Sequence, residues 1–337
     1  MPPPEYEIIC MGRSSIDLYS SDIGAPFPEI TSFDAFVGGC PTNVCVGAQR
    51  LGARTALLTA VGEDPVGDFL ERFLRTEGVE TGFVRRKPGT RTSAVLLGIE
   101  PPDRFPLVYY RNGCADIELN IDDVLDTPID RAGALLISGT GLSREPSRSA
   151  TMLAARRARA AGTTVYLDLD FRSDQWHDVR AFGVVIASVL PWIDVVLGTE
   201  EEVKAAALAD QLDVSISHSQ ISAPTVGGDI EQAVRTLLAG GSETLVLKRG
   251  ADGARVFLPD GQTMDVDAFS VEVVNILGAG DAFAAGLMVA RQQGCDWREA
   301  VRLANANGAI VVTRSGCANF MPTREEVTAF IRAQEKA

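Results

Sequence analysis

The sequence predicts an α/β protein with a doubly wound, mostly parallel central sheet that carries helices on both faces. Short runs rich in β-branched and apolar residues alternate with longer stretches in which apolar residues recur at helical spacing. Several of the short runs are almost wholly apolar, which is typical of strands buried on both faces of a parallel sheet. Together these patterns indicate an α/β/α arrangement of three layers.

The elements follow from these patterns in chain order. Strands are predicted at residues 6–11, 55–60, 134–138, 163–169, 194–197 and 244–248. Helices are predicted at residues 42–51, 66–76, 147–161, 200–209, 230–238, 279–293 and 297–313.

Two segments interrupt the alternation. Residues 14–36 and 92–111 contain strand-like runs separated by turn residues, with no helical period. We expect them to pair into a small accessory sheet. The Ser-rich residues 212–229 indicate a loop and not a domain boundary, so we expect one domain over residues 1–337.

Charge and hydropathy exclude several classes of partner. The chain has 31 basic and 45 acidic residues, a net charge of −14, which is the wrong sign for binding nucleic acid or an anionic membrane surface. The least polar long stretch, residues 184–197, is shorter than the roughly 20 residues that span a bilayer. The first residues lack a signal-peptide pattern. We therefore expect a cytoplasmic protein with no nucleic-acid and no membrane partner.

Cysteine and histidine usage limits the chemistry. The six cysteines form no C-x-x-C pair, so we interpret them as reduced thiols. Two histidines, His177 and His218, disfavour zinc sites and Ser-His-Asp catalysis. Catalysis then depends on carboxylates, backbone amides and basic side chains.

The segment of residues 275–286 is rich in small residues and leads directly into the helix predicted at residues 279–293. Here Gly278, Ala279 and Gly280 precede Asp281, so free backbone N–H groups at the helix start can bind phosphate oxygens. Asp281 can act as the base that takes a proton from an attacking hydroxyl. The alternative is an ordinary glycine-rich helix start that Asp281 caps.

A second small-residue segment opens the helix predicted at residues 42–51. Gly38 and Gly39 let a sugar approach the backbone, and Asn43 offers its amide to a polyol. The spacing G-G-x-P-x-N, followed by Gly52 and Gly62 and later by G-A-G-D-x-F-x-x-G, resembles the two signatures of the pfkB family of ribokinase-like carbohydrate kinases. The resemblance runs from about residue 7 to residue 322.

The resemblance implies a ribokinase-like fold whose lid is the accessory sheet. It implies ATP and Mg²⁺ as cofactors, with Asp281 as the base and residues 278–281 around the transferred phosphate. Asp17 would hold sugar hydroxyls together with Gly38, Gly39 and Asn43. The family usually has D-T-x before G-A-G-D, whereas Ile276 and Leu277 provide no hydroxyl to a phosphate or an ion, so a monovalent cation stays an open question.

The resemblance also assigns residues at later strand ends. Asp168 and Arg172 match a D-x-N-x-R segment, in which Asp170 replaces the usual Asn. Arg172 would meet a phosphate or a substrate carboxylate, although a structural ion pair is an equal alternative. Thr199 and Glu202 match N-x-x-E, whose glutamate acts on Mg²⁺ through water, although an acidic first helical turn is the simpler interpretation. The nucleotide would contact Lys248, Gly250, Gly253, Asn307 and Thr199.

Further similarities in the sugar-side segments narrow the choice of substrate. Residues 12–19, 23–27, 32–34, 38–43 and 100–106 are similar to family members that phosphorylate a sugar acid of inositol catabolism. We therefore expect transfer to the C6 hydroxyl of a sugar acid. Its carboxylate would need a cation on the lid side, for which Arg111 is the first choice, Arg13 the second and Arg172 a third candidate.

Other functions stay open. Within the family, kinases of 2-keto-3-deoxygluconate or of fructose are alternatives. A nucleotide-dependent dehydrogenase is disfavoured because no G-x-G-x-x-G follows the first strand, and a non-catalytic sensor is disfavoured by the intact Asp281. The unpaired edge and apolar face expected of the lid predict a homodimer that forms through the lid.

Overall fold

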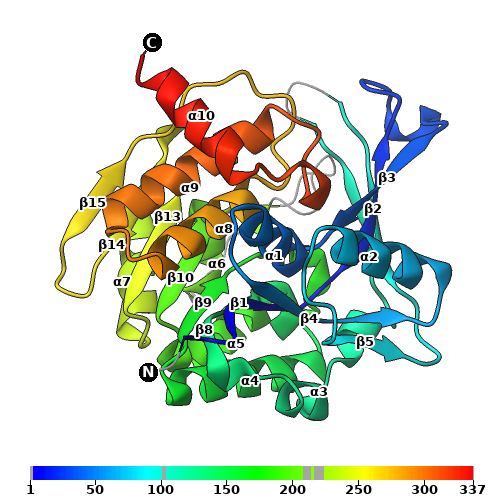
Figure 1. Cartoon of the computed structure of the whole chain (residues 1–337), viewed down its shortest axis with the longest axis horizontal. Coiled ribbons are helices and arrows are strands. Elements are labelled where there is room, and N and C mark those ends of the chain that lie inside the picture. Colours follow the sequence, from blue (N-terminus) through cyan, green and yellow to red (C-terminus); the bar gives the residue numbers. More distant parts are fainter. Residues whose placement is uncertain (1–2, 101–103, 208–213, 216–223, 337) are drawn as a thin grey trace.

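The computed structural model describes residues 3–100, 104–207, 214–215 and 224–336. A nine-stranded sheet runs through its middle in the order β15-β14-β13-β10-β9-β8-β1-β4-β5 (Figure 1). Neighbours are parallel from β13 to β5, and β14 and β15 are antiparallel additions at one edge. The strands are β1 (Tyr6–Met11), β4 (Thr55–Gly62), β5 (Val84–Lys87), β8 (Ala132–Ser138), β9 (Thr164–Asp168), β10 (Val195–Thr199), β13 (Thr244–Lys248), β14 (Ala254–Phe257) and β15 (Thr263–Val266).

Two hydrophobic cores lie on the two faces of this sheet, because successive residues of a buried strand point to opposite sides. In β1, Ile8 and Cys10 belong to one core, and Ile9 and Met11 belong to the other. The first core is closed by α1 (Cys40–Arg50), α2 (Pro65–Thr76), α8 (Ala279–Gln292), α9 (Trp297–Val312) and α10 (Arg324–Gln334). The second is closed by α3 (Ile121–Leu125), α4 (Ser147–Ala161), α5 (Val179–Val189), α6 (Glu200–Ala206) and α7 (Ile230–Ala239). The predicted three layers are therefore confirmed.

The accessory sheet is also confirmed. Its strand order is β3-β2-β6-β7, and β2 and β3 project from one side of the main sheet (Figure 1). A small third core, which includes Tyr19, Val95 and Leu107, lies on its inner face together with Cys317. We call this sheet the lid; its strands are β2 (Ser15–Ser20), β3 (Phe33–Gly38), β6 (Ser93–Leu97) and β7 (Leu107–Tyr110).

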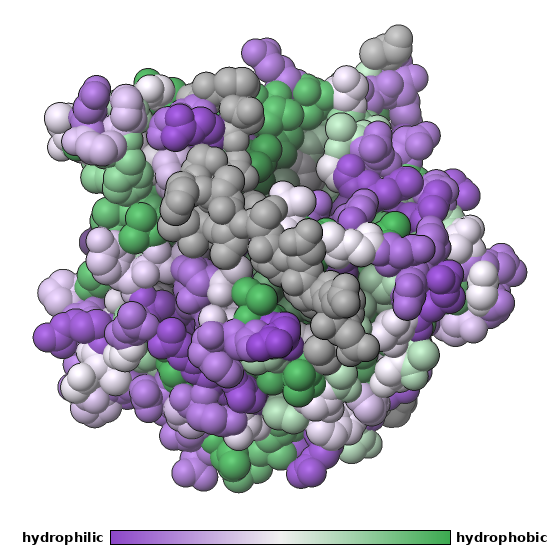
Figure 2. Space-filling view, turned by 180° about the vertical axis from the view of Figure 1, so that it is seen from behind, coloured by the Kyte–Doolittle hydropathy of each residue, from purple (hydrophilic) through white to green (hydrophobic). Residues whose placement is uncertain are grey.

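The predicted strands and helices all occur, with ends that differ by a few residues. The sequence patterns did not predict the charged edge strand β5, the edge strands β14 and β15, the short helix α3, the almost uniformly apolar helix α5 and the polar helix α10. The loop predicted at residues 212–229 lies largely outside the described residues. In its described part, β11 (Val214–Ser215) and β12 (Thr225–Val226) pair. Within the described ranges, no helix combines the length and the apolar character needed to cross a membrane. Seen from behind, the surface is mainly hydrophilic, with hydrophobic residues in separate patches (Figure 2).

The topology brings the chemically important segments to one edge of the sheet. The carboxyl ends of the parallel strands β1, β8, β9, β10 and β13 meet there, and ligands of open α/β sheets bind at this edge. The N-terminus of α8 follows a turn at the same edge, and α1 follows the lid strand β3 directly.

Candidate active site

The turn before α8 exposes backbone amides. Gly278 is the N-cap and has φ +78°, and no side chain caps the helix. Asn275 holds the turn, because its Oδ1 accepts from Leu277 N at 3.0 Å and its Nδ2 donates to the carbonyl of Ser315 at 2.7 Å. The first amides of a helix have no intrahelical partner, so this turn can bind an anion. We call residues 275–281 the phosphate turn.

Asp281 lies in the first turn of α8 and faces α1. Its Oδ2 accepts a hydrogen bond from Asn43 Nδ2 at 2.7 Å. Burial raises the pKa of Asp281 to about 6, with Asp170 adding to the rise, while Asn43 and the thiol of Cys40 oppose it. A carboxylate with a pKa near neutrality is suited to general base catalysis. The two sequence signatures thus meet in a direct hydrogen bond.

Two more carboxylates end β9. Asp168 is 2% exposed, and its pKa is raised by burial and by the neighbouring Glu202, Asp170 and Asp281, against the opposing charge of Lys248. Asp170 is 3% exposed and has φ +36°, a conformation that non-glycine residues rarely adopt. Thr140 Oγ1 donates to Asp170 Oδ2 at 2.8 Å. Backbone strain of this kind collects at functional sites.

Two cations lie among these acids. Lys248 Nζ is 3.0 Å from Asp168 Oδ2, and a Cβ at position 280 would lie 3.2 Å from the same Nζ, so this ammonium borders the phosphate turn. Burial opposes the charge of Lys248, but Asp168 and Glu202 outweigh it and raise its pKa. Arg172 Nη2 lies 3.0 Å from Asp170 Oδ1, and its buried Nε has no partner among the described residues.

Thr199 and Glu202 form a capping box at the start of α6. Thr199 N donates to Glu202 Oε2 at 2.8 Å, and Glu202 N donates to Thr199 Oγ1. Glu202 Oε1 accepts from the backbone N–H of Phe171 at 3.2 Å. These residues therefore form the acidic first helical turn that the sequence also indicated. Glu202 is 9% exposed and lies close to Asp168 and Arg172.

The predicted sugar side lies where the lid meets the main sheet. Asp17 on β2 is 6% exposed, and Ser15 Oγ donates to its Oδ1 at 2.7 Å. Gly38 and Gly39 are required here, because a Cβ at position 38 would overlap the Asp17 carboxylate and one at position 39 would overlap the carbonyl of Arg13. The buried Oδ1 of Asn43 has no partner among the described residues.

Arginines gather around Tyr109 of the lid. The guanidinium of Arg13 lies 5.4 Å from the centre of the Tyr109 ring, and Arg13 Nη1 donates to Ser15 Oγ at 2.7 Å. The charges of Arg172 and Arg13 both act on the Tyr109 hydroxyl, although burial raises its pKa. Tyr109 was not singled out from the sequence, since a tyrosine at the end of a predicted strand indicates packing.

Arg111 is committed to a buried ion pair. Its Nε lies 2.7 Å from Asp116 Oδ2, and both side chains are almost fully buried. Nη1 donates to the carbonyl of Thr140 at 3.0 Å and to Ser143 Oγ at 3.1 Å. Only Nη2 is left without a hydrogen bond in the described residues. The prediction that Arg111 meets a substrate carboxylate stays a prediction, and Nη2 is the nitrogen through which it would act.

The predicted nucleotide side includes the turn that follows β13 and a part of α9. Gly253, with φ +75°, packs closely against the backbone of Val266 and Asp267. Asn307 is 1% exposed and packs against Gly286 between α8 and α9, so it does not reach this turn. Asn305 does: its Nδ2 donates to the carbonyls of Val266 at 3.1 Å and Asp267 at 2.9 Å. Gly250, with φ +57°, has open space around it.

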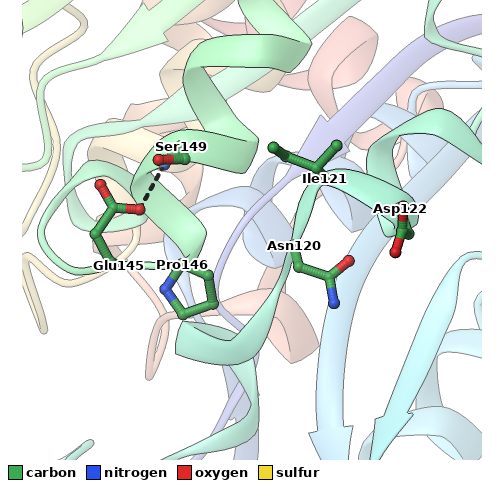
Figure 3. A pocket seen from close by; sticks show the side chains of 6 residues that line it. All are labelled: Asn120, Ile121, Asp122, Glu145, Pro146 and Ser149. Atoms are coloured by element: carbon green, nitrogen blue, oxygen red, sulfur yellow. Dashed lines mark hydrogen bonds between the residues drawn. The ribbon is translucent and has the colours of Figure 1, made fainter.

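Two surface hollows differ in their relation to these residues. The one in Figure 3, about 460 Å³, lies at the starts of α3 and α4, is lined by none of the predicted site residues, and contains a hydrogen bond from Ser149 N to Glu145. Another, about 380 Å³, borders the Arg111 ion pair, because Ser143 and Gln175 line it and face Arg111. The second hollow adjoins the predicted sugar side.

Comparisons with known proteins find relatives that match nearly the whole chain. The sequence profile of the "pfkB family carbohydrate kinase" matches residues 6–324. A 5-dehydro-2-deoxygluconokinase of Shouchella clausii (strain KSM-K16) is 30% identical over 331 residues, 98% of this chain and 97% of that protein. A 5-dehydro-2-deoxygluconokinase of Clostridium perfringens is 29% identical over 333 residues, 98% of this chain and 94% of that protein.

Solved structures share the fold. A fructokinase with bound ATP from Xylella fastidiosa superposes with a TM-score of 0.84 at 25% identity, over 97% of this chain and 98% of that one. A ribokinase II from E. coli in complex with ATP and Mg²⁺ gives a TM-score of 0.84 at 23% identity, over 97% and 99%. The ribokinase-like fold expected from the sequence is thereby confirmed.

Proposed function

Because this chain belongs to the pfkB family of carbohydrate kinases, we propose that it transfers the γ-phosphoryl group of ATP to the C6 hydroxyl of 5-dehydro-2-deoxy-D-gluconate. The observation that carries the proposal is Asp281, a carboxylate with a pKa of about 6 beside uncapped helix amides and hydrogen-bonded to Asn43. The names of the relatives at about 30% identity support the choice of sugar acid.

In the proposed reaction, Asp281 takes the proton of the C6 hydroxyl while that oxygen attacks the γ-phosphorus and the bond to the ADP oxygen breaks. Asn43 fixes one carboxylate oxygen and leaves the other for the proton. The amides of residues 279–281 and the ammonium of Lys248 stabilise the negative charge on the transferred group.

Mg²⁺ and ATP fit the acid cluster. The charges of Glu202, Asp170 and Asp281 add to the raised pKa of Asp168. A bound cation would offset this repulsion between the carboxylates. Within the described ranges, no three acidic, His or Cys side chains converge as metal ligands. Mg²⁺ usually keeps waters and phosphate ligands, so we assign Glu202 a role through water. When bound, the ion neutralises phosphate charge during transfer.

Arginines support an anionic sugar. Arg111 Nη2 is held in place by the bonds of Nε and Nη1, so it is preorganised for a carboxylate oxygen. Arg13 and Arg172 lie on the same side, around Tyr109. Asp17 and the unpartnered Oδ1 of Asn43 are the acceptors that we assign to the sugar hydroxyls. The nucleotide is assigned to Lys248, Gly250, Gly253, Asn307 and Thr199.

A panel assay tests the proposal. ADP formation is followed with 5-dehydro-2-deoxy-D-gluconate, 2-keto-3-deoxygluconate and fructose, each with ATP and Mg²⁺. We expect the first to give the highest kcat/KM. A preference for 2-keto-3-deoxygluconate or fructose would change the assigned substrate and leave the kinase assignment in place. No turnover with any of a broader set of sugars would favour a non-catalytic sensor.

We further propose one kinase domain over residues 1–337, supported by a family match that spans residues 6–324, and a homodimer that forms through the lid. The outer lid face carries Leu18, Leu96 and Val108, which cross-strand pairing places in one row, and Tyr110, which is 58% exposed. A second copy would cover this apolar face. Light scattering at micromolar concentration should give a dimer, and Tyr110→Asp should give a monomer.

ATP as co-substrate and six unpaired cysteines are typical of the cytoplasm, where we place the reaction.

A further inference from the structure

Cys317 lies at the junction of the lid and the phosphate turn. Its side chain is 5% exposed, and its Sγ lies 3.5 Å from Asp17 Oδ2. The hydroxyl of Tyr19 hydrogen-bonds to the same sulfur. Asp17 and Tyr19 are two residues apart on β2, so both face this thiol from one side of the strand.

The backbone of Cys317 contacts the other half of the site. A Cβ at Gly278 would lie 2.8 Å from Cys317 N, so residue 317 packs directly on the N-cap of α8. The next residues of α8 include Asp281. Cys317 thus contacts both the phosphate turn and the carboxylate assigned to the sugar.

The conformation of Cys317 indicates that its side chain is needed. Residue 317 has φ +64°, in the left-handed region that glycine occupies without steric cost. A non-glycine residue held there at a candidate active site points to a role for its side chain.

The thiol is an uncharged donor. Burial, together with the charge of Asp17, raises the pKa of Cys317 well above its usual range, so it carries its proton at neutral pH. Ser15 donates to Asp17 Oδ1 and Cys317 donates to Oδ2, so two neutral groups fix the carboxylate from its protein side.

We propose that Cys317 is a positioning residue of the sugar site, whose thiol holds the Asp17 carboxylate in the orientation that receives the sugar hydroxyls. This proposal rests on the proposed function, because it takes Asp17 as the sugar-binding carboxylate. It predicts that loss of the thiol weakens binding of the sugar and leaves binding of ATP unchanged.

The test compares Cys317→Ala and Cys317→Ser with Cys45→Ala, a buried thiol in α1 that serves as the matched control. Cys317→Ala should raise KM for the sugar about three- to tenfold and leave KM for ATP within about twofold. Cys317→Ser should restore most of the loss because it returns a donor, and Cys45→Ala should match the wild type.

Calorimetric binding of the sugar without ATP gives a second readout, using whichever sugar the wild type phosphorylates fastest. Weaker binding to Cys317→Ala than to Cys317→Ser supports the proposal. Equal binding to both variants and the wild type overturns it, as does an equal rise of KM for sugar and ATP, which indicates general damage. The proposed function is judged separately, on wild-type turnover alone.

Discussion

The phosphate turn and the proposed sugar site are built in opposite ways. The phosphate turn is one continuous segment, residues 275–281, whose working groups are backbone amides set by the φ of Gly278. The sugar site is assembled from distant segments: Asp17 on the lid, Asn43 on α1, Arg111 after β7 and Arg172 after β9. Local sequence therefore determines the first, and tertiary packing determines the second.

The energetics differ in the same way. Backbone amides keep their direction whatever side chains surround them, so a substitution in the phosphate turn can remove chemistry and leave the fold intact. In the sugar site, charges are paired with buried partners, as Arg111 is with Asp116. Removing one member leaves the other buried and unpaired, so binding and stability change together.

The largest effect is expected at the phosphate turn. Asp281→Asn should lower kcat by at least about a hundredfold and leave ATP affinity largely unchanged, because a general base contributes roughly 10²–10⁴ to the rate. Steady-state kinetics and calorimetric ATP binding measure the two quantities. Near-normal turnover would mean that Asp281 is not the base and serves only as the hydrogen-bond partner of Asn43.

The Arg111 ion pair gives the next largest effect. Arg111→Met should lower the free energy of unfolding by about 3–5 kcal/mol, because the fully buried Asp116 loses its partner. Adding Asp116→Asn should restore most of this loss. Urea denaturation of wild type, single and double variants checks it, and an unchanged midpoint for Arg111→Met would show that the pair contributes nothing.

Acid should inactivate the free enzyme through Asp281. Its pKa is about 6 and the base must be ionised, so activity is lost as pH falls through that value. From pH 7 to pH 5, kcat/KM should fall about tenfold. A pH profile checks this, with the residual activity of Asp281→Asn as the control that lacks the limb. A flat wild-type profile over this range would remove Asp281 as the base.

A smaller effect tests the proposed role of Glu202 in Mg²⁺ binding against its role in the helix cap. Glu202→Gln should raise the Mg²⁺ concentration for half-maximal activity about fivefold, since the water-mediated charge is lost. Thr199→Ala removes the helix cap but keeps the carboxylate, so it should lower Tm without moving the Mg²⁺ requirement. If both variants move only Tm, Glu202 has no part in metal binding.

The sequence predicted the layers, the lid and the phosphate turn because their signals are local. Strand and helix periods, glycines before a helix and the position of Asp281 can be recognised from neighbouring residues alone. Elements without such contrast were missed: β5 is mostly charged, and α5 is apolar on nearly every side.

The contacts of the site that the sequence could not predict have a tertiary cause. Asn305 and Asn307 are two positions apart on α9, and only packing decides that Asn305 faces the loop after β15 while Asn307 faces α8. In the same way, nothing near Arg111 in the sequence indicates that Asp116 turns back onto it. Cys317 is 300 positions away from the Asp17 that it contacts.

The most direct test of the central claim is the ratio of kcat/KM for 5-dehydro-2-deoxy-D-gluconate to that for fructose, measured with ATP and Mg²⁺ in the wild type and in Arg111→Met/Asp116→Asn. A charge-assisted hydrogen bond at the far end of the sugar is worth about one to two decades in kcat/KM. We predict a wild-type ratio of at least about ten that collapses toward one in the double variant, with fructose turnover unchanged. A wild-type ratio at or below one, or the same ratio in both proteins, would contradict the assignment of a sugar acid to this site.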